Sequence, residues 1–216
     1  MDLKLIYGNM RALCEAPQMM LHYADIPYEY KMVWDHYGSS WAEVKKDIIF
    51  NRLPILIINE DKYLWQSNTI IRYLSNLTKT KPSDEFQLAY CDAVFESTHE
   101  MFSPLNPTIN MTFGEKYNSN KKKLLEDILP NSLNNFEKLL QNSSGNFFIG
   151  NDPFYCDFNA YHHFSMCLIL DKNIFSNFPN LKKFINNFEK LNNIKNYLDG
   201  RPELVELGNS PHFLID

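Results

Sequence analysis

Residues 52–74 read RLPILIINEDKYLWQSNTIIRYL, and this stretch decides the fold class. The apolar run 55–58, the polar turn 59–62 and the aromatic segment 63–65 predict a β-hairpin. A proline stands at the entry to its first strand, where a missing N–H does least harm. Ser67 then precedes apolar residues at helical spacing and is predicted to be the N-cap of a helix. The stretch therefore predicts a strand–strand–helix unit.

The residues before this unit predict a strand, a helix and a second strand. Residues 3–7 read as a short strand, residues 10–23 carry apolar side chains at helical spacing, and residues 28–33 read as another strand. Pro17 is tolerable only near the first turn of a helix, so this helix is expected to begin late or to bend. Residues 1–80 are therefore predicted to form an α/β domain of the order βαβ followed by ββα.

The rest of the chain shows only helical periodicity. A polar, proline-bearing segment at residues 78–84 is the predicted linker. The predicted helices beyond it span residues 86–112, 119–141, 153–170, 178–188 and 191–199. Asp152 and Pro153 are the predicted N-cap and first residue of the third of these helices. Residues 86–216 are therefore predicted to form an all-α domain.

The composition narrows the functional classes. The net charge is −5, which argues against nucleic acid as a partner, because such binding depends on Lys and Arg neutralising phosphates. The helical part carries all of this charge, since residues 1–79 hold nine basic and nine acidic side chains. No window approaches the roughly 20 apolar residues of a membrane helix, and the first residues do not resemble a signal peptide. A cytoplasmic protein without a membrane span is expected.

The cysteines and histidines argue against metal and disulfide chemistry. The four cysteines form no C-x-x-C pair and have no zinc-like spacing, so reduced thiols are expected. Cys14 falls inside the first predicted helix and not at the end of the first strand, which argues against a disulfide oxidoreductase. His162 and His163 are neighbours on a predicted helix, so their rings point apart and no metal site is expected.

Short motifs along the chain occur in an informative order. They are LIYGNMR at residues 5–11, WAEVK at 41–45, RLP at 52–54, QSNTIIRYL at 66–74, IGNDPFYCDF at 149–158 and FPNLKKF at 178–184. In this order they resemble the tyrosine-type cytosolic glutathione transferases, and the last two are similar to signatures of the mu and sigma classes. The resemblance covers essentially the whole chain. It implies a thioredoxin-like domain that binds glutathione, followed by a helical-bundle domain that forms a hydrophobic substrate pocket, with glutathione as co-substrate and no cofactor.

The resemblance assigns the catalytic role to Tyr7. A thiol with a pKa of about 8.5 is mostly protonated at neutral pH, and the thiolate is the nucleophile. Lowering that pKa by about two units takes roughly 2.7 kcal/mol, which a charge-assisted hydrogen bond from a neutral phenol can supply. Tyr7 ends a strand, where α/β proteins place ligand-facing residues. Arg11 is implied to add positive potential near the sulfur, and a solvated surface arginine is the alternative.

The resemblance also implies the contacts to glutathione. Gln66 and Ser67 hold the γ-glutamyl group, whose carboxylate meets the positive end of a helix dipole. Leu53 pairs its backbone with the cysteinyl part of glutathione, and Pro54 is expected in the cis form. The implied contacts to the glycine carboxylate are Trp41, Lys45 and Arg52.

The second-substrate pocket is expected between the Tyr7 loop and the first long helix of the helical domain. Its predicted lining is Gly8, Leu13, Asn106, Asn110, Phe113 and Phe213. Phe50 matches an aromatic residue that many of these enzymes insert into a partner subunit, which predicts a homodimer. Glu100 is expected to approach the glutathione amine from that partner.

Three functions remain open at this point. The leading one is a glutathione S-transferase of the detoxifying kind, an enzyme that directs the glutathione thiolate at a soft hydrophobic electrophile. The first alternative is a glutathione-dependent isomerase or peroxidase, similar to a prostaglandin synthase, that uses the same thiolate. The second is a ligand-binding or crystallin-like relative that has lost turnover. The intact motifs at Tyr7, residues 53–54 and residues 66–67 weigh against the loss of glutathione binding.

Overall fold

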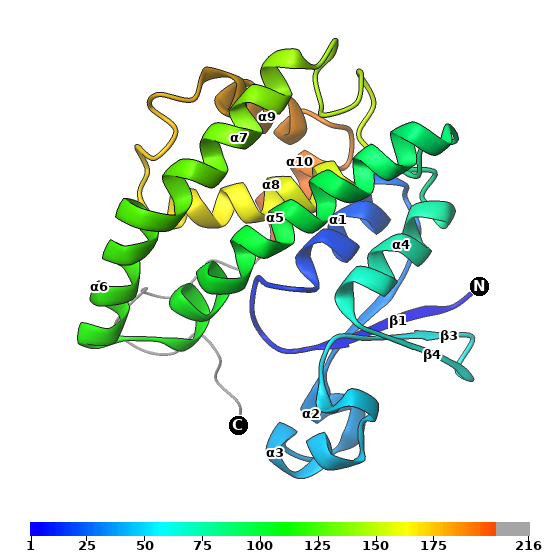
Figure 1. The fold of residues 1–216 in the computed structure, drawn as a ribbon. Helices are drawn as coiled ribbons and strands as arrows, with labels where there is room; N and C mark the ends of the chain where they lie inside the picture. The colour runs from blue at the N-terminus through cyan, green and yellow to red at the C-terminus, as the bar shows by residue number, and fades with distance from the viewer. Residues whose placement is uncertain (202–216) are drawn as a thin grey trace.

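A four-stranded mixed sheet forms the first part of the chain in the computed structural model, which describes residues 1–201 (Figure 1). The strands are β1 (Leu3–Tyr7), β2 (Glu29–Met32), β3 (Ile55–Ile58) and β4 (Lys62–Trp65). They lie in the order β2-β1-β3-β4, with β1 parallel to β2 and antiparallel to β3. β3 and β4 pair as the predicted hairpin. Together with the helical part described below, this sheet confirms the predicted fold class.

Alternating side chains of the central strands enter two different cores. Leu5 of β1 and Leu56 of β3 are buried in the main core, together with residues of the two helices that cover this face. Ile6 and Ile55 are buried in a smaller core on the opposite face, which also contains Val33. Because neighbouring residues of a strand point to opposite faces, the continuous apolar run of β3 is buried on both sides.

The first helix, α1 (Glu15–Tyr23), begins later than the apolar pattern, as the proline requires. Pro17 is its third residue, where the missing N–H has no partner within the helix in any case. Two short helices that the sequence pattern did not predict follow β2, namely α2 (Val33–Tyr37) and α3 (Trp41–Val44). The Glu43 carboxylate accepts the Ser40 N–H at 3.1 Å, so a Ser-x-x-Glu signal was present in the sequence.

The helix that follows the hairpin, α4 (Ser67–Leu77), corrects one prediction. Ser67 is its first helical residue and not its N-cap. Gln66 occupies the N-cap position with a φ of 68°, and its carbonyl accepts the Ile70 N–H at 3.0 Å. The boundary lies one residue earlier than predicted, because the Gln66 carbonyl already takes part in the helical hydrogen bonding.

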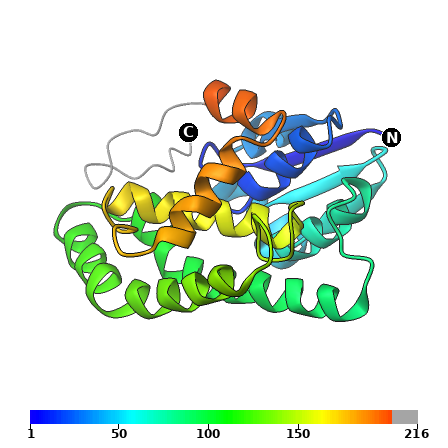
Figure 2. The same cartoon turned by 90° about the horizontal axis from the view of Figure 1, so that it is seen from above.

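The remaining described residues form helices only, at or near the predicted positions (Figure 2). These helices are α5 (Glu85–Met111), α6 (Gly114–Lys123), α7 (Leu129–Asn142), α8 (Tyr155–Leu170), α9 (Pro179–Glu189) and α10 (Ile194–Gly200). A π-helical turn at Leu124–Ile128 joins α6 to α7, so the predicted helix at 119–141 is a longer segment that begins at residue 114. No helix within residues 1–201 has both the length and the apolar character needed to cross a membrane.

Helix α8 is the centre of the helical part. It packs along α5, where the Asn159 side chain donates to the Thr98 hydroxyl at 3.0 Å and the His163 ring stacks on Phe102 at 4.1 Å. Its N-cap is Phe154, which corrects the prediction of Asp152. The buried Asp157 carboxylate accepts the Phe154 N–H at 2.8 Å and thereby fixes the helix start at this later residue.

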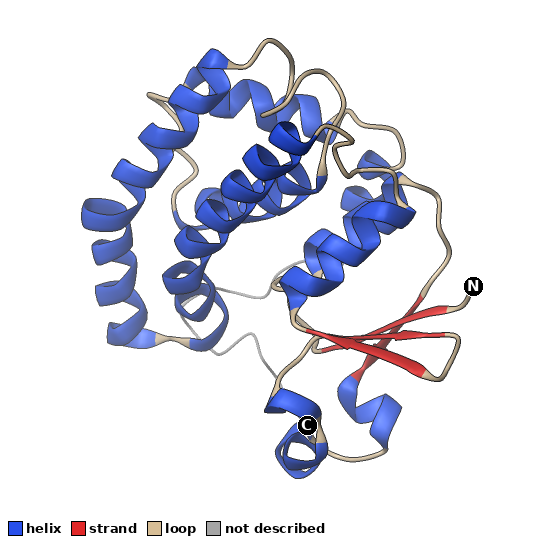
Figure 3. Cartoon of the chain, turned by 45° about the vertical axis from the view of Figure 1, so that its right-hand side comes forward, coloured by secondary structure: helices blue, strands red, loops and turns tan. Residues whose placement is uncertain are grey.

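Contacts between the sheet-bearing part and the helical part are both apolar and ionic. Figure 3 shows the helices above the sheet next to those of the helical part. The rings of Tyr23 in α1 and Phe158 in α8 meet edge to face at 5.3 Å. Arg72 in α4 pairs with Asp92 at 2.8 Å and with Glu96, both in α5. This junction is where the predicted catalytic loop lies.

Candidate active site

The strand register brings three predicted site motifs to one edge of the sheet. Ile6 pairs with Ile55 in the antiparallel pair β1–β3, so Tyr7 and the residue before Ile55 share this edge. Ile55 also pairs with Trp65 of β4, which places the start of α4 there as well. The end of β1, the entry to β3 and the first turn of α4 therefore converge, although they are far apart in the sequence.

The Tyr7 hydroxyl lies in a protected hydrogen-bonding position. The side chain is only 5% exposed. Its oxygen accepts the Leu13 N–H at 3.3 Å, and its hydrogen is directed to the Met10 thioether at 3.6 Å. Burial, and to a lesser degree Cys14, raise the pKa of Tyr7 well above its usual value, and the Leu13 N–H offsets this only in part. The phenol is therefore neutral at physiological pH and is available as a hydrogen-bond donor.

The loop after β1 is held by residues that the sequence analysis missed. The Tyr30 hydroxyl, on the neighbouring strand β2, donates to the Gly8 carbonyl at 2.8 Å. The Met10 N–H donates to the same carbonyl at 3.0 Å. The strand pattern at residues 28–33 places Tyr30 beside β1, but no local signal shows that its hydroxyl reaches this loop.

The two segments predicted to hold the cysteinyl and γ-glutamyl parts of glutathione are a cis peptide bond and a helix start. The Leu53–Pro54 peptide bond is cis, as expected from the resemblance. Leu53 is half-buried and Pro54 is buried at the entry to β3. Ser67 is 9% exposed at the first position of α4, so its N–H is one of the amides that have no acceptor inside the helix. Such amides, at the positive end of a helix, favour a carboxylate.

The residues predicted at the glycine end of glutathione lie on the side of the sheet that carries α2 and α3. Trp41 is half-buried and packs against the smaller core, as does Leu53. Lys45 is exposed, with its ammonium 6.0 Å from the Trp41 ring centre, and Arg52 is exposed before the cis bond. The Lys45 ammonium near the Trp41 ring suits a carboxylate ligand, and the contact of Arg52 with glutathione stays a prediction.

The surroundings of Arg11 differ from those of a solvated surface arginine. Burial and the nearby Arg201 lower the pKa of Arg11, whereas Glu15 acts in the opposite direction. The Arg11 carbonyl accepts a long hydrogen bond of 3.5 Å from the Asn110 side chain. Arg11 thus lies at the junction with α5 and α10, and its contact with glutathione stays a prediction.

The predicted pocket residues have different environments. Gly8 is buried and Leu13 half-buried in the loop after β1. Asn110 is fully buried and donates to the Asn106 side chain at 2.8 Å, so this amide pair supports the loop. Phe113 is 53% exposed at the start of α6. Phe213 lies outside the described residues.

The two residues predicted to meet a partner subunit lie on the surface. Phe50 is 60% exposed, with a φ of 64°, and its ring is 6.2 Å from that of Trp65. Glu100 is exposed on α5. The dimer contacts of both residues stay predictions.

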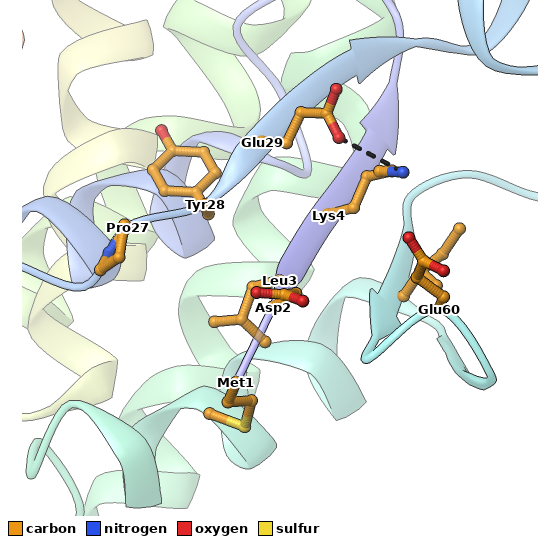
Figure 4. A pocket seen from close by; sticks show the side chains of 9 residues that line it. Met1, Asp2, Leu3, Lys4, Pro27, Tyr28, Glu29 and Glu60 are labelled. Atoms are coloured by element: carbon orange, nitrogen blue, oxygen red, sulfur yellow. Dashed lines mark ion pairs between the residues drawn. The ribbon is translucent and has the colours of Figure 1, made fainter.

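A hollow elsewhere on the sheet is separate from this site. A hollow of about 360 Å³ lies at the opposite end of β1, next to Asp2 and Glu60, where Lys4 pairs with Glu29 at 3.3 Å (Figure 4). None of the predicted site residues lines it. Within residues 1–201, no group of three or more His, Cys, Asp or Glu side chains is arranged to hold a metal ion.

Comparison with known proteins identifies the family. Residues 1–76 match the model of the glutathione S-transferase N-terminal domain, and residues 99–201 match that of the C-terminal domain. A glutathione S-transferase of Plasmodium yoelii yoelii is 32% identical over 173 residues, which cover 78% of this chain and 79% of the relative. Glutathione S-transferase P of Caenorhabditis elegans is 29% identical over 205 residues, which cover 93% and 94%.

A solved structure agrees with these sequence matches. The pi-class glutathione S-transferase of Onchocerca volvulus has a TM-score of 0.81 at 26% identity, and the alignment covers 93% of this chain and 94% of that one. The match thus extends over the sheet and the helical part together. The chain belongs to the glutathione S-transferase family of enzymes.

Proposed function

We propose that this protein binds glutathione at the sheet edge that ends in Tyr7, stabilises its thiolate with the Tyr7 hydroxyl and conjugates it to a soft hydrophobic electrophile. The observation that carries the proposal is the hydrogen bonding of this hydroxyl. Its oxygen already accepts the Leu13 N–H, and its hydrogen meets only the weakly accepting thioether of Met10, 3.6 Å away. A thiolate is a much better acceptor, so it replaces the thioether at little cost.

The electrostatics of the site suit a donor and not a base. Because burial raises the pKa of Tyr7, the phenol keeps its proton while the thiol of bound glutathione loses its own. A charge-assisted hydrogen bond contributes about 1.5–3 kcal/mol, which corresponds to a thiol pKa about one to two units below its free value. The Leu13 N–H strengthens this bond, since a hydroxyl that accepts one hydrogen bond becomes a better donor of another.

The remaining predicted contacts fit an extended tripeptide that lies along the sheet edge. The γ-glutamyl carboxylate meets the Ser67 amide at the start of α4, next to Gln66. The cysteinyl backbone pairs with Leu53 beside the cis bond, in the manner of an added strand. The glycine carboxylate then points toward Trp41, where Lys45 supplies positive charge. This order directs the sulfur to Tyr7.

The proposed enzyme is a cytoplasmic homodimer. Four free cysteines, all buried, support a reducing compartment. The exposed Phe50 ring supports an aromatic contact with a second copy of the chain, and Glu100 then approaches the glutathione amine of the partner's site. The acceptor substrate enters beside Gly8 and Leu13, with Arg11 contributing positive potential near the sulfur.

The substitution Tyr7→Phe tests the proposal, because it keeps the ring and removes only the hydroxyl. The pKa of bound glutathione is followed by the ultraviolet absorbance of its thiolate, and turnover by conjugation of a chlorodinitrobenzene. We expect retention on immobilised glutathione to persist while the thiol pKa returns from about 6.5 to about 8.5. Conjugation then falls about 50-fold at a pH of about 6.5, in proportion to the thiolate fraction.

Two outcomes contradict the proposal. Undiminished conjugation by Tyr7→Phe removes Tyr7 from the mechanism. Equal inactivity of the parent protein and the variant, with glutathione still retained, indicates a binding protein that does not turn over.

A further inference from the structure

A buried ion pair joins the start of α1 to the end of the described chain. The Arg201 guanidinium donates to the Glu15 carboxylate at 2.7 Å, and the side chains are 16% and 3% exposed. Glu15 is the first residue of α1, and Arg201 directly follows α10. A carboxylate this deeply buried costs several kcal/mol unless it is paired, so the position of Glu15 depends strongly on Arg201.

The same helix start supplies the hydrogen bond to the catalytic phenol. The Leu13 N–H donates to the Tyr7 oxygen at 3.3 Å, only two residues before Glu15. The Glu15 N–H in turn donates to the Ala12 carbonyl at 3.0 Å, which closes a tight turn around Leu13. A displacement of Glu15 therefore moves the peptide that carries the Leu13 N–H.

The other hydrogen bonds described for this loop act at residues before Leu13. Tyr30 holds the Gly8 carbonyl, and Asn110 reaches the Arg11 carbonyl at 3.5 Å, the length of a weak hydrogen bond. The hydrogen bond between Arg201 and Glu15 is much shorter and acts on the C-terminal side of Leu13. The loop is thus fixed from the sheet at its beginning and from α10 at its end.

Glu15 lies among several charged and titratable groups at this junction. The charged and titratable groups that act on it or on its neighbours are Arg11, Cys14, Tyr28, Tyr30, Tyr161, Glu189, Tyr197 and Arg201. Burial is the largest cause that raises the pKa of each of the four phenols, so all of them stay neutral near physiological pH. Glu15 lies near both arginines, and the Arg201 guanidinium donates directly to its carboxylate.

We propose that Glu15 and Arg201 are positioning residues for Tyr7: their ion pair across the junction holds the Leu13 N–H on the phenol oxygen. This inference rests on the proposed function of Tyr7. Through Leu13, α10 sets how strongly the phenol donates to the thiolate, and it does so without touching either substrate. The helical part thereby contributes to ionisation of glutathione as well as to the acceptor pocket.

The test measures the pKa of bound glutathione in Arg201→Met, which keeps much of the stem and removes the charge. We expect that pKa to rise by about one unit, which corresponds to about tenfold less thiolate at acidic pH. Glutathione affinity at high pH is expected to change little, because Ser67 and Leu53 lie on α4 and at the entry to β3 and not at the start of α1, where Arg201 makes its ion pair. Arg201→Lys restores the charge without the planar fork, so an intermediate pKa is expected.

Arg72→Met is the matched control, because Arg72 also joins the two parts of the chain through ion pairs but makes them with Asp92 and Glu96 of α5 and not with the start of α1. We expect it to lower the melting temperature and to leave the pKa of bound glutathione unchanged. If Arg201→Met behaves in the same way, the Glu15–Arg201 pair only stabilises the junction and the inference is wrong. Should Arg201→Met fail to fold, the same comparison with Arg201→Lys decides.

The parent protein and Tyr7→Phe are measured alongside. A parent thiol pKa that equals that of free glutathione contradicts the proposed function itself. The other decisive result is a thiol pKa that is lowered in the parent protein, returns to the free value in Tyr7→Phe and stays lowered in Arg201→Met. That result contradicts only the positioning role of Glu15 and Arg201.

Discussion

Replacement of His162 by leucine is predicted to make the protein less sensitive to acid. The His162 side chain is 2% exposed in α8, and neither ring nitrogen has a hydrogen-bond partner among the described residues. Burial lowers its pKa to about 3, and the nearby Arg201 and Arg11 act in the same direction. The imidazole is therefore neutral in the folded protein at pH values well above 3.

The magnitude follows from the difference between the folded and unfolded pKa values. An unfolded histidine has a pKa of about 6.5, so between about pH 6.5 and pH 3 the unfolded chain binds a proton that the folded chain does not. The free energy of unfolding thus falls as the pH falls, by about 1.4 kcal/mol per unit. Between pH 7 and pH 5 this amounts to about 2 kcal/mol for this one side chain.

Urea unfolding of the parent protein and His162→Leu, at several pH values from about 7 to 5, measures this term as a difference. Titrating groups that do not interact with His162 contribute equally to both proteins and cancel. We expect the variant to be at least as stable near pH 7, because leucine removes two buried polar atoms without partners, and its advantage to grow by about 2 kcal/mol at pH 5. Parallel stability curves for the two proteins would refute the reasoning. His36→Leu, at a more exposed histidine, serves as the control and is expected to show a smaller change.

Two further substitutions test the fold and the assembly. Asp157→Ala leaves the buried N–H of Phe148 and the partly buried N–H of Phe154 without their acceptor, so calorimetry is expected to show a loss of about 2–4 kcal/mol in stability. Asp157→Asn keeps one acceptor and is expected to lose less. A loss below about 0.5 kcal/mol for the alanine variant contradicts this role of Asp157. Phe50→Ser removes the exposed ring that is proposed to contact a second copy of the chain. Light scattering is therefore expected to show a larger monomer fraction than in the parent protein. Identical masses of the two proteins at every concentration contradict the contact.

Much of the fold follows from local patterns in the sequence. The alternation at residues 3–7 and the hairpin at 55–65 are found as predicted, because the two-residue period of a strand is written directly into the side chains. The late start of α1 follows from Pro17 alone. The long helices appear near their predicted positions, because their apolar side chains recur at the helical period.

The errors concern helix starts and short helices. Ser67 and Asp152 are both reasonable N-caps by residue type, but the starts of α4 and α8 are set by Gln66 and by the Asp157 carboxylate. The helices α2 and α3 are too short for a periodic pattern to identify. In each case a hydrogen bond or a turn sets where the helix begins, and the preference of a residue type for the N-cap does not.

Some features of the candidate site follow from local motifs, and others arise only when the chain packs. The residue types at the end of β1, at the cis bond and at the start of α4 could be identified from the sequence, because short motifs are recognisable before the packing is known. Only the packed fold brings together the distant residues behind the Tyr7 loop: Glu15 and Arg201 meet from 186 residues apart, and Asn110 reaches Arg11 across 99. Such pairs leave no mark in a local pattern, since their geometry arises only when the helices pack against the sheet.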